Sequence, residues 1–239
     1  MGLILLIRIL RIAMNYLFVV AHPDDEVLGA GGTISKLSEE GNKVDVCILC
    51  GEANARKNKP EAEKLNLDMI NCCKILGVKT VYMGNFPNIE FNTVPHIELV
   101  QFIEKILTVT EAESVFTHHT ADVNNDHYHT SLACQAAIRI FQRDTAKKPV
   151  KELFFMEIPS STEWSLNSSL QPFQPNVFVE IKEEGLNKKI EALSQYEGVM
   201  REYPHPRSKE AIRGLAAFRG CQAGLFYAES FELVFRRGI

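Results

Sequence analysis

The sequence predicts an α/β protein with a doubly wound, mostly parallel sheet that carries helices on both of its faces. Short apolar runs rich in β-branched and aromatic residues alternate with longer segments of helical spacing, from about residue 16 to residue 143. Such alternation is typical of parallel, doubly wound sheets. The chain has 239 residues, 46% of them apolar, which suits the core of one large domain.

The expected strands and helices are bounded by their apolar runs and by glycine or proline at their ends. The first strand is expected at about 16–21, and the helix at 27–40 has Gly41 at its C-terminal cap position. Pro95 falls in the first turn of a later helix, where a backbone N–H has no helical partner to lose. The remaining strand and helix pairs are expected at 43–49 with 60–76, 80–83 with 94–107, and 114–117 with 127–143.

The last third of the chain departs from this alternation. It contains no repeat, low-complexity tract or linker. The sequence therefore predicts a single domain over residues 14–239, whose C-terminal third adds strands and helices around the site. In this third we expect strands at 152–158, 176–181 and about 230–235, and helices at about 185–197 and 208–223.

Residues 1–13 are interpreted as an N-terminal extension, with Met14 as the natural start directly before the first strand. The alternative is a short amphipathic membrane anchor. The stretch is apolar but is broken by Arg8 and Arg11, and it is shorter than the roughly 20 residues that a spanning helix needs. It also lacks a cleavage-site pattern. No stable membrane span is therefore expected.

Composition limits the partners and the compartment. The net charge of −4 gives no indication of a surface for nucleic acid or anionic membranes. The six cysteines form no disulfide framework and no convincing secretion signal is present, so a cytoplasmic location is expected. Cys47 and Cys50 form a C-x-x-C, but they lie in a predicted strand without a second such pair, which disfavours a metal or redox role. The sequence leaves open whether the chain forms a homo-oligomer.

The first predicted strand ends abruptly at a histidine and three acids, in the segment 22–26. This segment lies at the carboxyl end of a strand, the edge where ligands bind in open α/β sheets. Three crowded carboxylates repel each other unless a positive charge lies among them, which favours a metal site. The alternative is an acidic helix start, because the helix dipole stabilises acids in the first turn. That alternative accounts for Asp25 and Glu26 but leaves His22 unexplained.

A second polar stretch, 117–129, also follows an apolar strand and opens a helix. The carboxyl ends of parallel strands share one edge of a sheet, so His127 can meet His22 and Asp25 there. Three nitrogen or oxygen ligands plus a water are typical of a catalytic zinc site. His22 and Asp25 are three residues apart and share one side of a helical turn, which leaves Asp24 available to act as a base.

Three other residues of the second stretch are candidates for supporting roles. Asp126 is expected to orient His127, because ligand histidines usually donate their second N–H to a carboxylate or carbonyl. His118 and His119 are expected to contact the substrate or to support the ligands from behind. Asp122 is interpreted as a loop-turn residue rather than as part of the site.

The remaining candidates for substrate contact lie in or near other loops. Trp164, the only tryptophan, is in a polar segment, where an exposed aromatic ring suits stacking on a sugar or a base; core packing is the alternative. Arg56, Arg207 and Arg219 are positive charges without an obvious partner. One of them is expected to contact a phosphate if the substrate carries one, and a plain surface position is the alternative for each.

Several of these motifs together resemble a known family. The Ala-His-Pro-Asp-Asp-Glu of 21–26 with the Gly-Ala-Gly-Gly of 29–32, and the Asn-Asp-His of 125–127, resemble the PIG-L/LmbE-like family of zinc-dependent N-acetylglucosaminyl deacetylases. Segments 157–164 and 203–208 are similar to a bacterial branch of that family. The resemblance runs from about Met14 to the C-terminus. It implies a Rossmann-like fold, zinc held by His22, Asp25 and His127, and Asp24 as the general base.

The sequence departs from the family pattern at one position of the second motif. Many members have His-Pro-Asp-His there, and the first histidine assists the substrate oxygen or a proton transfer. The matching residue here is Asn124, so another group must serve if one is needed. His205 is the candidate for this catalytic role, because prolines on both sides stiffen its loop. A surface turn is the alternative interpretation of His205.

We therefore expect a metal-dependent hydrolase of carbohydrate metabolism, acting on a linear amide. It would remove the acetyl group from an N-acetylglucosamine-type sugar, sugar nucleotide or glycoconjugate and release acetate and a free amine. Zinc is the expected cofactor, and another divalent transition metal stays open. Which sugar and which carrier the enzyme takes is not encoded in these motifs.

Two other function classes fit the motifs less well. A metal-dependent phosphoester hydrolase is disfavoured, because imidazole ligands suit zinc whereas carboxylates with water suit magnesium. A non-catalytic nucleotide-binding module is disfavoured as well. The glycines of 29–32 lack the G-x-G-x-x-G spacing at the turn, and the preceding acids would repel a pyrophosphate. These glycines are instead expected to allow close packing of the helix against the sheet.

Overall fold

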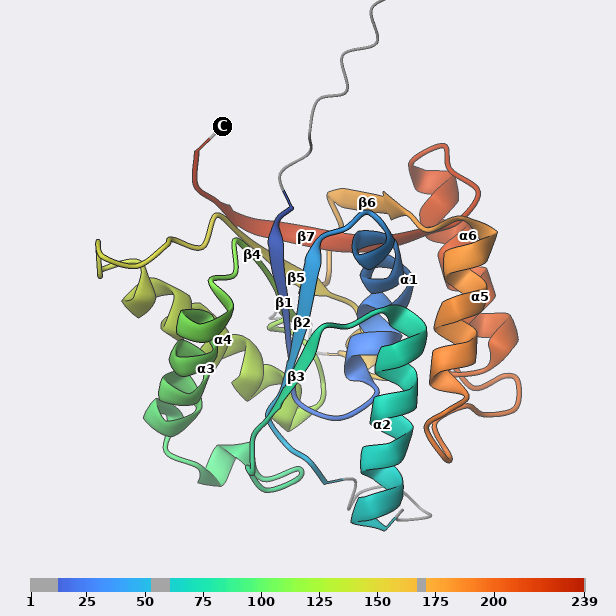
Figure 1. The fold of residues 1–239 in the computed structure, drawn as a ribbon. Helices are drawn as coiled ribbons and strands as arrows, with labels where there is room; N and C mark the ends of the chain where they lie inside the picture. The colour runs from blue at the N-terminus through green and yellow to red at the C-terminus, as the bar shows by residue number, and fades with distance from the viewer. Residues whose placement is uncertain (1–12, 53–60, 167–170, 239) are drawn as a thin grey trace, which may run out of the picture.

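The structure is a computed structural model that describes residues 13–52, 61–166 and 171–238 of the chain. These residues build a seven-stranded sheet in the order β3-β2-β1-β4-β5-β7-β6, with helices on both faces (Figure 1). The predicted α/β fold is confirmed. The strands are β1 Asn15–Val20, β2 Lys43–Ile48, β3 Thr80–Met83, β4 Ser114–His118, β5 Glu152–Met156, β6 Val177–Glu180 and β7 Ala228–Arg236.

The sheet is mostly parallel, as predicted. β1 pairs in parallel with β2 and with β4, β2 with β3, and β4 with β5, whereas β7 is antiparallel to both β5 and β6. The chain therefore moves outward from β1 to β3 and then returns to place β4 on the other side of β1. In open α/β sheets such a switch point leaves a crevice at the carboxyl ends of the two central strands.

Two layers of helices cover the sheet (Figure 1). Because β1 is buried on both faces from Leu17 to Val20, this part of the strand is apolar throughout. Phe18 and Val20 belong to the core shared with α1 and α2, and Leu17 and Val19 to the core shared with α3 and α4. The helices are α1 Asp25–Glu39, α2 Ala62–Leu76, α5 Lys182–Leu193 and α6 Lys209–Gln222 on one face, and α3 His96–Thr110 and α4 Asn125–Phe141 on the other. Two short 3₁₀ turns, η1 Phe91–Thr93 and η2 Thr162–Trp164, lie in connecting segments.

Helix α1 is interrupted at Ala30, where the backbone leaves the helical region (φ −149°, ψ 18°). Two buried charges from distant elements pair with backbone groups on either side of the break. The Lys189 ammonium of α5 donates to the Leu28 carbonyl at 2.8 Å and to the Glu229 carboxylate of β7 at 2.7 Å. That carboxylate accepts the N–H groups of residues 32 and 33 of α1 at 3.0 and 2.7 Å. Side chains therefore pair with the backbone groups on both sides of the break.

The glycines that follow the first motif allow close packing, as predicted. A Cβ on Gly29 would lie 2.8 Å from Ile158 and 3.2 Å from Met156 of β5. A Cβ on Gly32 would lie 2.9 Å from two methyl carbons of Ile181, at the start of α5. The close approach thus serves both the sheet and α5, and these glycines contribute to packing.

Several boundaries differ from the predicted ones. The helix expected at 94–107 begins at His96, after Pro95, and continues to Thr110. His118, expected in a loop, is the last residue of β4. The proposed extension at 1–13 falls almost wholly outside the described residues, and so does Arg56; both assignments stay predictions. Among the residues that the structure describes, no helix has the length and apolar character needed to cross a bilayer.

Candidate metal centre and active site

Three connecting segments meet at the carboxyl edge of the sheet. β1 and β4 are neighbouring parallel strands, and so are β4 and β5, so the segments that follow them leave the sheet at the same edge. Residues 21–24 lead from β1 into α1, residues 119–124 lead from β4 into α4, and residues 157–161 lead from β5 into η2. The first two segments carry the two motifs that the sequence singled out.

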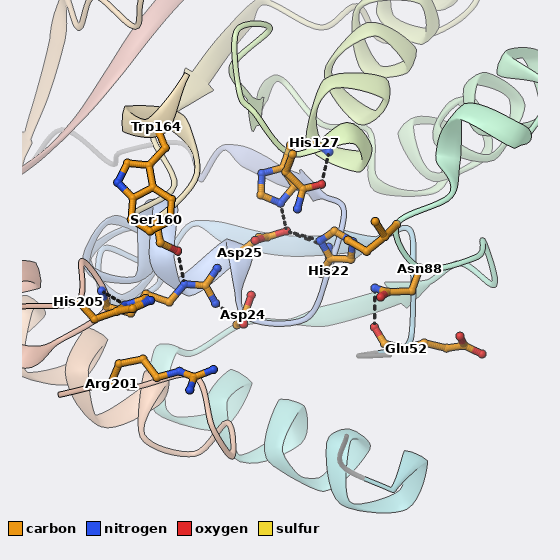
Figure 2. A pocket seen from close by; sticks show the side chains of 13 residues that line it. His22, Asp24, Asp25, Glu52, Asn88, His127, Ser160, Trp164, Arg201 and His205 are labelled. Carbon is orange, nitrogen blue, oxygen red and sulfur yellow. Dashed lines mark hydrogen bonds and ion pairs between the residues drawn. The ribbon is translucent and has the colours of Figure 1, made fainter. Parts of the chain in front are cut away.

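The predicted ligands His22, Asp25 and His127 lie next to one another (Figure 2). His22 Nδ1 is 3.3 Å from Asp25 Oδ2, and His127 Nε2 is 3.2 Å from the same oxygen. Ligand atoms about 2.1 Å from a tetrahedral ion are separated by roughly 3.4 Å. Two imidazole nitrogens and one carboxylate oxygen are thus spaced as ligands of a divalent metal ion.

The charges of these groups depend on one another. Burial alone would raise the pKa of Asp25, but the neighbouring imidazoles of His127 and His22 hold that pKa well below its usual range. Burial alone would lower the pKa of His127, but the carboxylates of Asp25 and Asp122 raise it to about 10. Protons on the imidazoles supply the positive charge that the carboxylates require. A divalent cation that replaces those protons would serve the same purpose.

Asp126 supports His22 and not His127, which corrects the expectation that it orients His127. Its Oδ2 lies 2.9 Å from His22 Nε2. The carboxylate is fixed by the backbone N–H groups of Ile89 and Phe91, at 2.6 and 3.0 Å. Because Nε2 of His22 is engaged by Asp126, Nδ1 is the nitrogen that faces Asp25 and is left for a metal.

Asp122 takes the role that was expected of Asp126, so its interpretation as a plain turn residue is wrong. Its Oδ2 lies 3.1 Å from His127 Nδ1. The hydroxyls of Ser161 and Thr162 also donate to this carboxylate, the latter at 2.8 Å. Asp122 does accept the Asn124 N–H at 2.8 Å, as a turn residue would. These contacts fix both the tautomer and the orientation of His127.

His118 and His119 of the second motif lie in different surroundings. His118 is buried behind the ligands, where its Nε2 accepts the Ala21 N–H at 2.9 Å and its ring stacks on His127 with centroids 3.9 Å apart. Burial and the neighbouring His127 lower the pKa of His118 to about 3. His119 contacts Glu232 at 3.4 Å. Neither histidine lines the cavity described next, so a direct substrate contact by either is not supported.

A cavity of about 260 Å³ is lined by the three ligand candidates and by Asp24. Asp24 occupies the N-cap position of α1, yet its side chain makes no capping hydrogen bond. Its backbone has φ 109°, in the left-handed region that residues other than glycine seldom adopt. Strained backbone of this kind persists where the surroundings fix it, often at functional sites. The carboxylate is thereby available to the cavity instead of to the helix.

The two walls of the cavity differ in chemistry. Figure 2 shows Trp164, Ser160, His205 and Arg201 on one side of the ligand set, and Asn88 with Glu52 on the other. Arg207, on the first side, donates to Ser160 at 2.6 Å and lies 3.4 Å from Asp24 Oδ2. Trp164 is 51% exposed and its ring meets that of His205 edge to face, so the core-packing alternative for Trp164 is excluded. Burial, Arg207 and Arg201 lower the pKa of His205.

Arg219, expected among the unattached charges, is paired. Its guanidinium forms a two-point contact with the Glu157 carboxylate at 2.7 and 2.6 Å. It does not line the cavity. Its role is therefore to hold α6 against the segment after β5.

The two motif-bearing loops fall within one family match. The sequence profile of the PIG-L family, described as GlcNAc-PI de-N-acetylase, matches residues 17–138. The chain belongs to the PIG-L family. The predicted family is confirmed, and the matched segment spans β1 to α4, including all three ligand candidates and Asp24.

Other proteins and solved structures resemble the chain over most of its length. Diacetylchitobiose deacetylase from Thermococcus kodakarensis is 23% identical over 240 residues, covering 91% of this chain and 82% of that protein. The conserved protein TT1542 from Thermus thermophilus superposes with a TM-score of 0.77 at 24% identity, covering 95% of this chain and 97% of the other. GalB, the 4-carboxy-2-hydroxymuconate hydratase from Pseudomonas putida KT2440, gives 0.76 at 23% identity, with coverages of 95% and 98%. A hydratase shares this fold, so the fold alone does not fix the reaction.

At the position where many PIG-L members have histidine, Asn124 serves as the N-cap of α4. Its side-chain oxygen accepts the backbone N–H groups of Asp126 and His127, at 2.9 and 3.4 Å. It also lines the cavity together with His22 and His127. The departure from the family pattern therefore lies inside the site.

Sequence reasoning missed the contributions of several polar residues. Ser160 and Ser161 reach Arg207 and Asp122 from the segment after β5. A signal for them was present, because a Pro-Ser-Ser-Thr run follows a third strand of the same parallel set. Glu52, Asn88 and Arg201 carried no comparable signal; each lies in a loop without a motif.

Proposed function

We propose that this chain hydrolyses the N-acetyl group of an amino sugar of the N-acetylglucosamine type, giving acetate and a free amine. One observation carries the proposal. Two imidazole nitrogens and a carboxylate oxygen converge at a cavity that also presents Asp24, whose carboxylate does not cap its own helix. Membership of the PIG-L family and a diacetylchitobiose deacetylase among its relatives support an N-deacetylase acting on a linear amide.

We assign zinc as the metal, held by His22, Asp25 and His127. Two imidazoles with one carboxylate leave a fourth position open, which is the donor pattern of catalytic zinc sites. When bound, zinc polarises a carbonyl and lowers the pKa of water from about 15.7 towards 7. Asp126 and Asp122 hold the two imidazoles by their second nitrogens, which supports the same assignment.

The chain's own residues supply the proton transfers. Asp24 takes a proton from the attacking water as the water oxygen bonds to the acetamide carbon. The carbon–nitrogen bond then breaks, and Asp24 returns the proton to the departing amine. Arg207, 3.4 Å from the Asp24 carboxylate, restrains the direction in which that carboxylate points.

His205 is assigned a hydrogen-bonding role beside this sequence. Its Nδ1 accepts the backbone N–H of Arg207 at 3.0 Å, so a neutral His205 carries its proton on Nε2. Its lowered pKa favours this neutral form at pH 7. His205 is therefore better suited to donate a hydrogen bond to the substrate than to protonate the amine, and Asp24 is the preferred proton donor.

The compartment belongs to the same proposal. All six cysteines are free, including the neighbours Cys47 and Cys50 in and after β2. Free thiols in this number support a reducing compartment, for which we propose the cytoplasm.

The test is acetate release from a panel of N-acetyl sugars and sugar nucleotides, measured with and without added zinc. We expect zinc-dependent release from at least one compound. The variant Asp24→Asn should retain the metal, measured by elemental analysis, and should lose at least about 100-fold in kcat. Wild-type rates in a metal-loaded Asp24→Asn enzyme would show that Asp24 is not the base. An absence of acetate release from every compound would refute the proposed reaction.

A further inference from the structure

Asn124 is fixed at the cavity by its backbone as well as by its side chain. It stands three residues before His127 and lines the cavity with His22 and Asp24. Its own backbone N–H donates to Asp122 at 2.8 Å, and its carbonyl accepts the Tyr128 N–H at 3.1 Å. Both ends of the residue are thus fixed relative to the metal ligands.

The side-chain amide of Asn124 has only one workable orientation. A carboxamide offers one acceptor oxygen and one NH₂ group with two donors. The oxygen receives the backbone N–H groups of Asp126 and His127, at 2.9 and 3.4 Å. Flipping the amide would set its NH₂ against these two N–H donors, which cannot accept a hydrogen bond. The NH₂ group must therefore lie on the side away from the helix start.

This NH₂ group is an uncommitted donor at the cavity. Among the residues that the structure describes, no side chain or carbonyl accepts a hydrogen bond from Asn124 Nδ2. An amide NH₂ cannot take up or release a proton near neutral pH, so it is unsuited to acid–base catalysis. It is suited to an oxygen that gains negative charge during a reaction. His118 and His119, which were expected to contact the substrate or to support the ligands, do not line the cavity.

We propose that Asn124 Nδ2 donates a hydrogen bond to the carbonyl oxygen of the scissile amide while that oxygen becomes an oxyanion. This rests on the proposed function. As the water oxygen bonds to the carbonyl carbon, the carbonyl π electrons move onto this oxygen and the water proton passes to Asp24. When the carbon–nitrogen bond breaks, the electrons return to re-form the carbonyl and the hydrogen bond weakens. Asn124 is therefore a catalytic residue and a helix cap at once.

The cap and the donor can be separated by substitution. Asn124→Asp and Asn124→Ser both keep an oxygen that can cap the helix, and both lose the NH₂ donors. Loss of one oxyanion donor typically lowers kcat by about 100- to 1,000-fold. We expect a fall of this size in both variants, with KM changed by less than about threefold and with zinc content and the unfolding midpoint retained. Asn92→Asp, an exposed change of the same kind outside the cavity, should leave kcat unchanged and controls for the added charge in Asn124→Asp.

Kinetic outcomes decide the proposal in both directions. A kcat within about threefold of wild type in Asn124→Ser would overturn it. A fall in kcat that is accompanied by loss of zinc or by a lower unfolding midpoint would overturn it too, because the residue would then act through the helix.

A binding measurement separates this proposal from the proposed function. Methylphosphonate, a tetrahedral anion with the shape of the hydrated acetyl group, should bind the zinc-loaded wild type at least about tenfold more tightly than Asn124→Ser. Calorimetry reports this difference without any turnover. Equal affinities would refute the donor role, whereas an absence of acetate release with an intact affinity difference would refute only the assigned reaction.

Discussion

The buried pair of Lys189 and Glu229 makes a quantitative prediction about stability. Lys189→Met keeps the apolar stem of the side chain and removes its ammonium. Glu229 then keeps its two backbone donors in α1 but loses the ammonium of Lys189. The Leu28 carbonyl loses the same ammonium as its side-chain donor. Both charged side chains are buried, 7% and 5% exposed, so water cannot replace the lost partner.

The expected size follows from this burial. Removing one partner of a buried ion pair typically costs about 3–5 kcal/mol, because the other charge stays buried and uncompensated. A domain of 150–250 residues loses roughly 2–4 °C in midpoint per kcal/mol. A loss of about 4 kcal/mol therefore corresponds to a midpoint lower by roughly 8–16 °C. The double variant Lys189→Met/Glu229→Gln should be less destabilised than the sum of its two single variants, because no buried charge remains.

Equilibrium unfolding in urea and thermal unfolding, both followed by circular dichroism, measure these changes. Lys188→Met is the matched control, since Lys188 is the preceding residue of α5 and pairs with Glu39 at the surface. It should cost no more than about 0.5 kcal/mol. A loss below about 1 kcal/mol in Lys189→Met, or strict additivity in the double variant, would contradict the reasoning that the pair supports the break in α1.

Three further predictions concern the ligands, the packing of α1 and the pH profile. His127→Ala should lose the metal, measured by elemental analysis, and full occupancy would exclude His127 as a ligand. Gly32→Ala should lower the free energy of unfolding in urea by about 1–3 kcal/mol, because its Cβ would lie 2.9 Å from Ile181. Gly214→Ala should not lower it, because a Cβ there would have no atom within 4 Å. Burial and two neighbouring arginines lower the pKa of His205, so its inflection in kcat/KM should lie below 6.5 and move upward in Arg201→Ala. An unchanged inflection in that variant would contradict the charge effect.

The fold was predictable because its signals are local. Most residues of the central strands are apolar, as burial on both faces favours, and each strand is followed by a segment of helical spacing. The ligand candidates were predictable for a related reason. Two polar motifs each followed a strand of one parallel set, and the carboxyl ends of such strands share an edge.

The partners of the ligands were not predictable from adjacency along the chain. Asp126 precedes His127 in α4, but consecutive helical side chains point in different directions. Asp126 therefore reaches His22 from the other loop, and Asp122 reaches His127. The difference between His118 and His119 depended on a strand boundary. The strand was expected to end at residue 117, but His118 is the last residue of β4, so only His119 belongs to the following loop.

The break in α1 depends on contacts that no local pattern contains. Lys189 and Glu229 are far from Ala30 in the sequence, and each on its own resembles an ordinary surface charge. Their burial follows from the packing of α5 and β7 against α1. This part of the fold could be found only from the assembled structure.

Asp24, Asp25 and Glu26 of the first motif have separate roles, and Glu26 is hydrogen-bonded by a residue of the C-terminal third. Asp25 faces the two imidazoles and Asp24 faces the cavity, so neither caps α1 in the usual way. Glu26 holds the N-cap residue itself, because its carboxylate accepts the Asp24 N–H at 3.1 Å while the Tyr196 hydroxyl donates to its other oxygen at 2.7 Å. Tyr196 lies beyond the segment that the family profile matches. The strained backbone that presents Asp24 is therefore held by a residue outside the motif, and an account of the motif that stops at α4 leaves out its support.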